Sequence, residues 1–229
     1  MEFEPHTIAL AAALAAAFAA FLAVVAANRK ERARRLKTLD DCGALLEAAR
    51  PGRAPSGYGV LRGHFAGRPA ALTPIAEAMA FRRLPQLWIA AALRAGPFEG
   101  SLEILRRPTG AEFYAGGDGL PLRLPPPPSW PRDARVKCDR AGAALAPRLE
   151  RLLAEAFTDP RVKAVGVGPG GVRVVRQAAQ GDAGAYRIFR DSRFASPRVA
   201  PEAAQAALTL AQAVAEALEQ DEAHVAEAA

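Results

Sequence analysis

The sequence predicts an α+β protein in which a single N-terminal transmembrane helix precedes a cytoplasmic domain of mainly antiparallel β-strands and two packing α-helices. Three observations support this prediction. Residues 8–27 are all uncharged and non-polar. Residues 58–190 contain short apolar segments, several with strand-like alternation, separated by turn residues such as Gly and Pro. Helical spacing of apolar residues appears at residues 144–158 and again from Pro201 onward.

The apolar run is long enough to cross a bilayer. Its twenty residues would extend roughly 30 Å as a helix, at about 1.5 Å per residue, which matches the hydrocarbon core. We therefore expect a transmembrane helix over residues 8–28. A secretory signal peptide is the competing interpretation, because Ala23, Ala26 and Ala27 resemble a cleavage site, although signal peptides usually carry positive charge before a shorter apolar core.

The residues that flank this run predict its orientation. Residues 1–7, a short external N-terminus, contain Glu2 and Glu4 but no Lys or Arg. Residues 29–37 form a basic collar, and the positive-inside rule places such a segment in the cytoplasm. We expect a bacterial inner-membrane protein whose collar contacts anionic phospholipid of the cytoplasmic leaflet. The headgroup contacts would be Arg29, Lys30, Arg32, Arg34, Arg35 and Lys37.

The predicted span has two different faces. Leu10, Leu14, Phe18 and Leu22 recur at helical spacing and form a ridge. The opposite face carries small residues, which allow close approach of another helix backbone. We expect it to pack against transmembrane subunits of a partner complex through Ala9, Ala12, Ala13, Ala16, Ala17, Ala20 and Ala23. A simple tether is the alternative, since Ala is abundant along the whole chain, as in proteins from GC-rich bacterial genomes.

The collar is predicted to continue as a basic juxtamembrane helix over residues 29–50. This stretch contains no Pro and a single Gly, and Leu36, Leu39 and Leu46 fall along one side of such a helix. Pro51-Gly52 would end the helix, so residues 51–57 are expected to be a linker.

The cytoplasmic α+β domain is expected to span residues 58–200 and to begin as a meander of antiparallel strands. A hairpin is predicted over residues 58–65 and 68–75, with Ala66-Gly67 as its turn. Two more strands, residues 87–94 and 101–106, would follow across a Gly96-Pro97 turn. Residues 108–139 are rich in Gly and Pro and are expected to be a stiff connection, with one short strand at residues 120–124.

The second half combines helical and strand-like patterns. A helix is predicted over residues 144–158, and a hairpin is predicted over residues 162–167 and 172–177. Residues 185–190 would add another strand. The final helix, residues 201–220, carries one apolar side that suits packing on the domain, and residues 221–229 would form an acidic tail.

No motif indicates catalysis. Residues 166–171 satisfy GxGxxG, but a strand-like segment follows and Pro169 has no backbone N–H, so a hairpin turn is expected rather than a dinucleotide site. His6, His64 and His224 are too scattered to propose a catalytic triad. Cys42 and Cys138 lack metal-like spacing and are expected to be free thiols. We expect no enzymatic activity, cofactor or metal.

The net charge and the position of the aromatic residues help to predict which partners the protein binds. The net charge of +6 and pI near 9.9 would suit nucleic acid, but the densest basic cluster adjoins the membrane span, so no nucleic acid is expected. Aromatic and basic residues concentrate at Phe81, Arg82, Arg83 and Trp88, a candidate protein interface. The alternative is a tryptophan that caps the core beside solvated arginines.

Together these features favour a non-enzymatic accessory or assembly subunit of a larger membrane complex, with respiratory or photosynthetic assemblies as candidate hosts. Its Ala-rich helix would contact partner helices while the domain braces the complex from the cytoplasm. The second hypothesis is a stand-alone membrane-anchored module that binds anionic lipid and a soluble protein or ligand.

Overall fold

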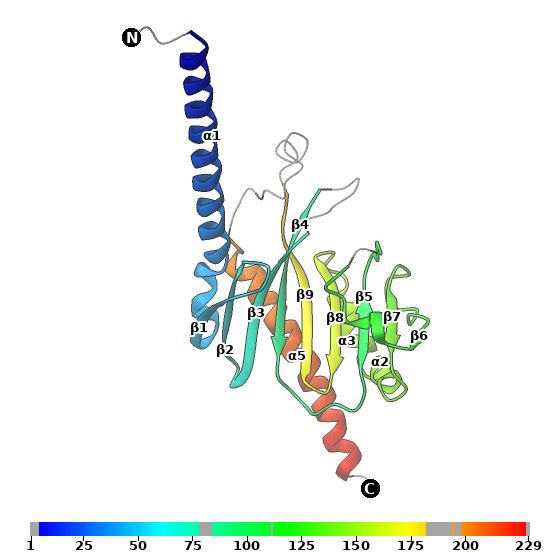
Figure 1. Ribbon diagram of the computed structural model, residues 1–229. Coiled ribbons are helices and arrows are strands. Elements are labelled where there is room, and N and C mark those ends of the chain that lie inside the picture. Colours follow the sequence, from blue (N-terminus) through cyan, green and yellow to red (C-terminus); the bar gives the residue numbers. More distant parts are fainter. Residues whose placement is uncertain (1–4, 78–83, 111, 182–193, 195–197, 228–229) are drawn as a thin grey trace.

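The computed structural model describes residues 5–77, 84–110, 112–181, 194 and 198–227. It confirms the α+β class: a long, exposed N-terminal helix precedes a nine-stranded antiparallel sheet that packs against helices (Figure 1). In chain order the elements are α1 (Pro5–Leu36), η1 (Asp40–Leu45), β1 (Glu47–Arg53), β2 (Gly59–Phe65), β3 (Arg68–Ala76), β4 (Gln86–Leu93), β5 (Leu102–Leu105), η2 (Gly116–Gly119), β6 (Leu122–Leu124), β7 (Arg135–Cys138), η3 (Gly142–Ala144), α2 (Leu145–Arg148), α3 (Glu150–Ala156), β8 (Val162–Gly168), β9 (Gly171–Gln180) and α5 (Pro201–Glu227).

The strand order is β1-β2-β3-β4-β9-β8-β5-β7-β6, and every pairing between these strands is antiparallel. The predicted hairpins β2–β3 and β8–β9 are confirmed, and the GxGxxG stretch forms the turn of the latter, with Gly168 opposite Gly171. The predicted meander from β4 to β5 is wrong, because β9 and β8 lie between them. The connection between β4 and β5 instead passes below the β8–β9 turn (Figure 1).

Gly171 makes this arrangement possible. Its φ is +123°, a backbone conformation that side chains rarely adopt, and a Cβ there would lie 2.1 Å from the carbonyl oxygen of Leu93. The hairpin turn can therefore rest directly on the chain that leaves β4.

The helix predicted over residues 29–50 is wrong beyond Leu36. The chain turns, forms η1 and then enters β1, the edge strand of the sheet, so part of the expected linker at residues 51–57 is also strand. Leu39, Cys42 and Leu46 are buried in the core. Their regular spacing reflects contact with the core from a turn and a 3₁₀-helix, a pattern that a longer amphipathic helix would share.

Several other predicted helices and strands have different boundaries in the structure. The helix expected at residues 144–158 is present but divided into α2 and α3 at Leu149. β7 was not predicted, because it lies in the Gly- and Pro-rich stretch. α5 continues to Glu227, so most of the expected acidic tail is helical. The strand predicted at residues 185–190 lies outside the described residues.

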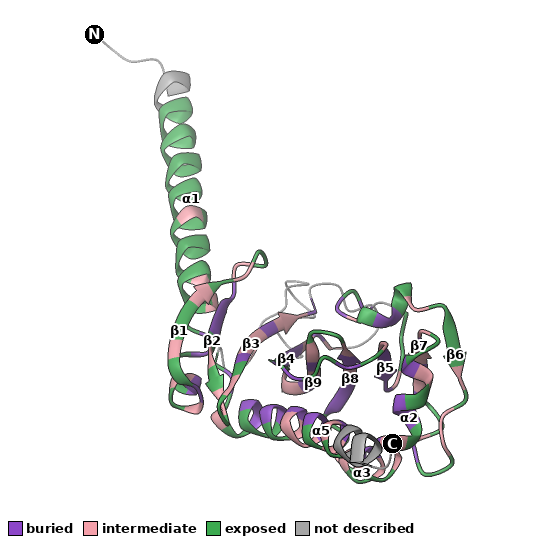
Figure 2. Ribbon diagram, turned by 90° about the horizontal axis from the view of Figure 1, so that it is seen from below, coloured by how far each residue is buried: buried purple, intermediate pink, exposed green. Residues whose placement is uncertain are grey.

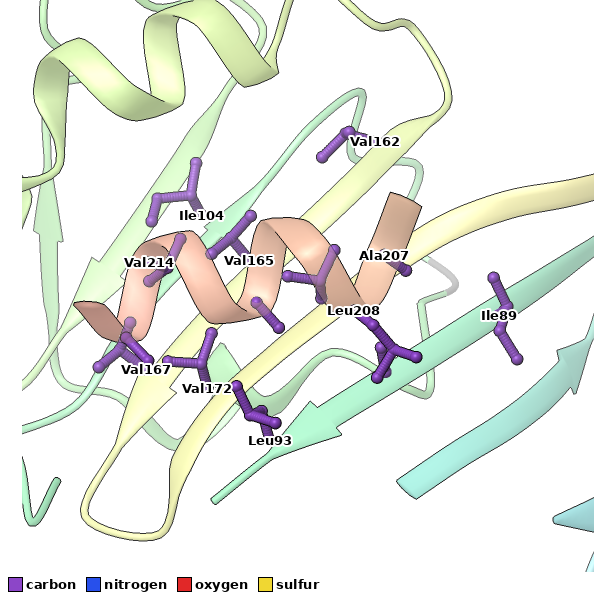
Figure 3. Packing of buried hydrophobic residues seen from close by; sticks show 14 of the residues in the cluster. Ile89, Leu93, Ile104, Val162, Val165, Val167, Val172, Ala207, Leu208 and Val214 are labelled. Atoms are coloured by element: carbon purple, nitrogen blue, oxygen red, sulfur yellow. The ribbon is translucent and has the colours of Figure 1, made fainter. Parts of the chain in front are cut away.

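The larger core lies between the sheet and α5. Strand alternation directs Leu87, Ile89 and Leu93 of β4 to this side, and all three are buried. In Figure 3, Leu208 and Val214 of α5 lie among apolar side chains of the sheet. Complete burial of such a side chain contributes roughly 1.5–3 kcal/mol.

A smaller core lies on the opposite face of the sheet. It consists of Trp88, Ala90, Leu105, Tyr114, Ala164 and Val175. Tyr114 belongs to an irregular segment between β5 and β6, so this segment covers the second face. Figure 2 shows α5 on one side of the sheet and α1 projecting from the other side.

We predict that Leu208→Ala lowers the free energy of unfolding by about 2–5 kcal/mol, because the side chain is fully buried between α5 and the sheet. Thr209→Ala, at the adjacent exposed position, should change it by less than about 0.5 kcal/mol. Denaturant unfolding of both variants measures the difference. Equal stability of the two variants would contradict the described packing of α5.

Candidate functional site

α1 is exposed along its apolar length. No residue in the most apolar part of the helix is buried. Leu10, Leu14, Phe18 and Phe21 each expose more than 60% of their surface. Each small residue proposed for helix packing is exposed as well, namely Ala9, Ala12, Ala13, Ala16, Ala17, Ala20 and Ala23. A single apolar, exposed N-terminal helix of this kind is compatible with a membrane anchor or a signal sequence.

The last turn of α1 is fastened to the domain. Gly59 lies so close to α1 that a Cβ there would be 2.1 Å from the carbonyl oxygen of Leu36. The guanidinium of Arg35 lies 5.5 Å from the ring centroid of Tyr58. Immediately after the helix, the carbonyl oxygen of Thr38 accepts a 2.8 Å hydrogen bond from the backbone N–H of Val199. α1 and the sheet thus meet without an intervening flexible linker.

The basic collar divides into two groups. Arg35 is half-buried and pairs with Glu31 at 3.0 Å, in addition to its contact with Tyr58, so it helps to hold α1 on the domain. The other candidate headgroup contacts are exposed: Arg29, Lys30, Arg32, Arg34 and Lys37.

Trp88, which was predicted as part of a candidate protein interface, does not lie on the surface. Trp88 is 4% exposed and belongs to the smaller core, where its ring centroid lies 6.1 Å from that of Tyr114. This placement corresponds to the alternative interpretation, a core tryptophan. Phe81, Arg82 and Arg83 lie outside the described residues.

A buried ion pair holds the segment that covers the smaller core. We call residues 106–110 and 112–117 the clamped segment. Nζ of Lys163, in β8, donates hydrogen bonds to the carbonyl oxygens of Arg106 and Arg107, at 2.8 and 2.7 Å, and to Oε1 of Glu112 at 2.9 Å. The side chains of Lys163 and Glu112 are 2% and 1% exposed. Three acceptors satisfy the three N–H groups of the ammonium ion, which compensates for its removal from water.

Glu112 in turn shapes the backbone around it. Its carboxylate accepts hydrogen bonds from the N–H and hydroxyl of Thr109, both at 2.8 Å, and from the N–H of Gly110 at 3.0 Å. Burial alone would raise the pKa of Glu112, but the hydrogen bonds from Lys163 and Thr109 outweigh it and lower the pKa from 4.5 to about 2. The carboxyl is therefore ionised at neutral pH.

Two further charged residues hold the rest of the clamped segment. Glu103, in β5, accepts hydrogen bonds from the N–H groups of Gly116 and Gly117, at 2.6 and 2.7 Å. Arg173, in β9, donates to the carbonyl oxygen of Tyr114 at 2.8 Å, and burial lowers its pKa. A cavity of about 220 Å³ lies beside both side chains.

These polar residues were not predicted as a site. Val162 and Lys163 fall at a register irregularity between β8 and β9, so strand alternation does not place the Lys163 side chain. A lysine within an otherwise apolar strand, in Val162-Lys163-Ala164-Val165, was the available signal. Charged residues in such positions are almost always paired.

An apolar notch lies beside the C-terminal end of α1, which we call the foot of the helix. It has a volume of about 360 Å³, and we call it the foot notch. Its walls include Tyr58, the chain before β2 and the end of β3, with Phe113 of the clamped segment at its rim. The lining residues are Arg35, Ala54, Pro55, Ser56, Tyr58, Thr73, Pro74, Ile75, Ala76 and Phe113.

A larger groove of about 670 Å³ lies between α3 and α5, on the other side of the sheet. Leu152, Ala156 and Leu210 form apolar parts of its lining, and Glu155 and Glu202 stand at its edge. The groove is thus partly apolar, and its charged side chains include Arg176 and Asp159, which form an ion pair at 2.9 Å, as well as the two glutamates.

The described residues offer no sign of metal or thiol chemistry. They contain no group of three or more His, Cys, Asp or Glu side chains that could hold a metal ion. Cys42 and Cys138 are buried free thiols, as expected, and burial raises the pKa of Cys42 to about 11. A thiol with such a pKa is a poor nucleophile at neutral pH.

We predict that Lys163→Met lowers the free energy of unfolding by about 3–5 kcal/mol, because Glu112 then remains buried without its counter-ion. Lys137→Met is the matched control. Nζ of Lys137, in β7, lies 3.6 Å from Oδ1 of the exposed Asp118. A surface pair of this kind contributes less than about 1 kcal/mol to the free energy of unfolding. Denaturant unfolding measures both. Equal losses would show that the buried pair is no more important than a surface pair.

The stabilisation that Glu112 provides should also depend on pH. The pKa of Glu112 is lower in the folded chain than its ordinary value of 4.5. Its contribution is therefore present above about pH 4.5 and is lost as the pH falls toward 2, amounting to roughly 3 kcal/mol. Unfolding measured between pH 7 and pH 2.5 should show a smaller acid-dependent loss in Glu112→Gln than in the unmodified chain. Identical pH profiles would contradict an ionised Glu112 in the fold.

Comparison of the chain with protein-family models, curated proteins and solved structures finds no match. Two features of the described residues are the candidates for a functional role: the exposed apolar helix fastened to the domain, and the clamped segment with the foot notch on the sheet face opposite α5.

Proposed function

We propose that this protein is a single-pass inner-membrane protein that acts without catalysis, as an accessory or assembly subunit of a larger membrane complex. One observation carries the proposal: α1 is exposed along its whole apolar length yet is fastened at its last turn to the sheet. A partner helix that packs on the small-residue face of α1 would thereby acquire a fixed position relative to the domain. Respiratory and photosynthetic assemblies are the hosts we consider first.

Retention of α1 as an anchor, rather than its removal as a signal sequence, is supported by the junction. The helix continues for nine residues beyond the apolar run, from Asn28 to Leu36. Arg35 at its end contacts Tyr58, and the carbonyl of Leu36 lies against Gly59. A signal sequence needs no such docking on the mature domain.

The proposed orientation is N-terminus outside and domain in the cytoplasm. Exposed basic residues of the collar follow the span directly, which the positive-inside rule favours on the cytoplasmic side. Attraction to anionic headgroups would amount to about 1 kcal/mol for each such residue near the surface.

A stand-alone membrane-anchored module is the second candidate. The groove between α3 and α5 favours it, because an apolar channel with Glu155 and Glu202 at its edge could receive a soluble protein or ligand without any intramembrane partner.

We predict that Ala13→Leu and Ala16→Leu, singly and together, weaken assembly, because added side chains separate helices that pack through small residues. Mild-detergent extraction and native size analysis should show the unmodified chain in a stoichiometric, high-mass assembly and the double variant outside it. Ala11→Leu, the same substitution on the side of the Leu/Phe ridge, is the matched control and should leave assembly intact. Migration of the unmodified protein as a monomer would contradict the subunit proposal and favour the second candidate.

Orientation is tested by protease access. Protease added to the outside of intact cells should leave the domain undigested, whereas the same protease should digest it in inverted membrane vesicles. Detergent-permeabilised cells show that the protease is active on this chain. Digestion in intact cells would contradict the proposed topology.

A further inference from the structure

The foot notch combines an apolar lining with an exposed aromatic rim. Ile75 and Pro74, at the end of β3, contribute to its lining, and Phe113 lies 72% exposed at its edge. Among the large hydrophobic side chains described outside α1, only Phe113 and Leu122 are strongly exposed. Single exposed apolar residues are ordinary, but Phe113 adjoins an apolar depression rather than standing alone.

Phe113 is held in place by the interactions of its neighbours. Glu112 is bonded to Lys163, and the carbonyl oxygen of Tyr114 accepts a hydrogen bond from Arg173. The rings of Phe113 and Tyr114 meet edge to face, with centroids 5.4 Å apart. The backbone on both sides of Phe113 is thus fixed to the sheet, so the aromatic ring is presented to solvent by a clamped segment rather than by a free loop.

The notch lies close to where the bilayer would be. Arg35, in its wall, follows the last apolar residue of the span, Ala27, by eight positions, or about 12 Å along a helix. Each headgroup layer is about 5–8 Å thick, given the difference between the hydrocarbon core and the whole bilayer. Transmembrane helices also tilt by about 20° on average. A modest tilt toward the notch would bring it to the headgroup layer.

The direction of α1 favours such a tilt. α1 projects from the side of the sheet opposite α5, and the clamped segment covers that same side (Figure 2). The exposed collar residues Arg32 and Arg34 belong to the same end of α1 as Arg35. Apolar surface, an exposed aromatic ring and positive charge are the features that interfacial membrane contacts use.

We propose that the foot notch is a binding site for the interfacial layer of an anionic phospholipid bilayer, with Phe113 inserted at the level of the headgroups. The proposal rests on the proposed membrane anchor and extends it: the domain does not hang freely below α1 but lies with its clamped face on the membrane. The opposite face, with the groove between α3 and α5, is then turned toward the cytoplasm.

The test uses the full chain in nanodiscs that contain phosphatidylcholine and phosphatidylglycerol. An environment-sensitive NBD label is attached to Phe113→Cys, to Leu122→Cys as the matched exposed control, and to Ala16→Cys as the reporter of α1 insertion. The unmodified chain measures background labelling of Cys42 and Cys138, which are fully buried. Quenching by lipids with a nitroxide at the headgroup or in the acyl chain reports the depth of each label.

We expect strong headgroup quenching and a blue-shifted emission at position 113, several-fold weaker quenching at position 122, and acyl-chain quenching at position 16. Nanodiscs of phosphatidylcholine alone should reduce the effect at position 113 while leaving position 16 unchanged. Pro55→Cys, at an exposed position in the lining of the notch, provides a second reporter if Phe113→Cys does not fold.

The outcomes separate the two proposals. Quenching at position 16 without quenching at positions 113 or 55 would overturn the lipid site and leave the anchor standing. Absence of quenching at position 16 would overturn the anchor itself. Equal quenching at positions 113 and 122 would show general proximity to the bilayer and would contradict a specific site at the notch.

Discussion

The buried pair of Lys163 and Glu112 is the interaction on which the arrangement of the sheet face opposite α5 depends. It lies beneath a segment with little regular secondary structure, where backbone groups would otherwise lack partners. A charged pair in such a place is costly unless every donor and acceptor is engaged. Here the ammonium ion has three acceptors, and the carboxylate receives hydrogen bonds from the chain on its own segment. The pair thus substitutes for the regular hydrogen bonding that a helix or strand would supply.

The two faces of the sheet are stabilised by different means. The face under α5 is covered by a helix whose apolar side chains fill the interface, so its stability comes from burial. The other face has a small apolar core and charged residues from three neighbouring strands, Glu103, Lys163 and Arg173, each bonded to the covering segment. Burial is tolerant of conservative substitution, whereas buried ionic contacts are not. The face opposite α5 is therefore the one that tolerates substitution less well.

How far the sequence predicts this molecule depends on how local each feature is. The hairpins β2–β3 and β8–β9 follow from alternation and turn residues over a few positions, and both are correct. The position of β5 depends on which strands pair at long range, which alternation does not encode. The extension of the juxtamembrane helix to Arg50 was wrong because Leu39, Cys42 and Leu46, which lie in η1 or directly beside it and contact the core, happen to share helical spacing. The sequence could not predict where the side chains of Lys163 and Phe113 lie. A register irregularity orients Lys163, and Phe113 belongs to an irregular segment.

The close contact between Gly59 and the carbonyl of Leu36 also fixes the rotational phase of α1 relative to the sheet. Because the helix is continuous from the apolar run to this contact, the rotation of its small-residue face about the helix axis is fixed relative to the domain. Each residue added or removed between Ala27 and Leu36 would turn the small-residue face by about 100° and displace it by about 1.5 Å along the axis. In the proposed membrane arrangement, the number of residues in the collar therefore determines on which side of the domain a partner helix would pack against α1.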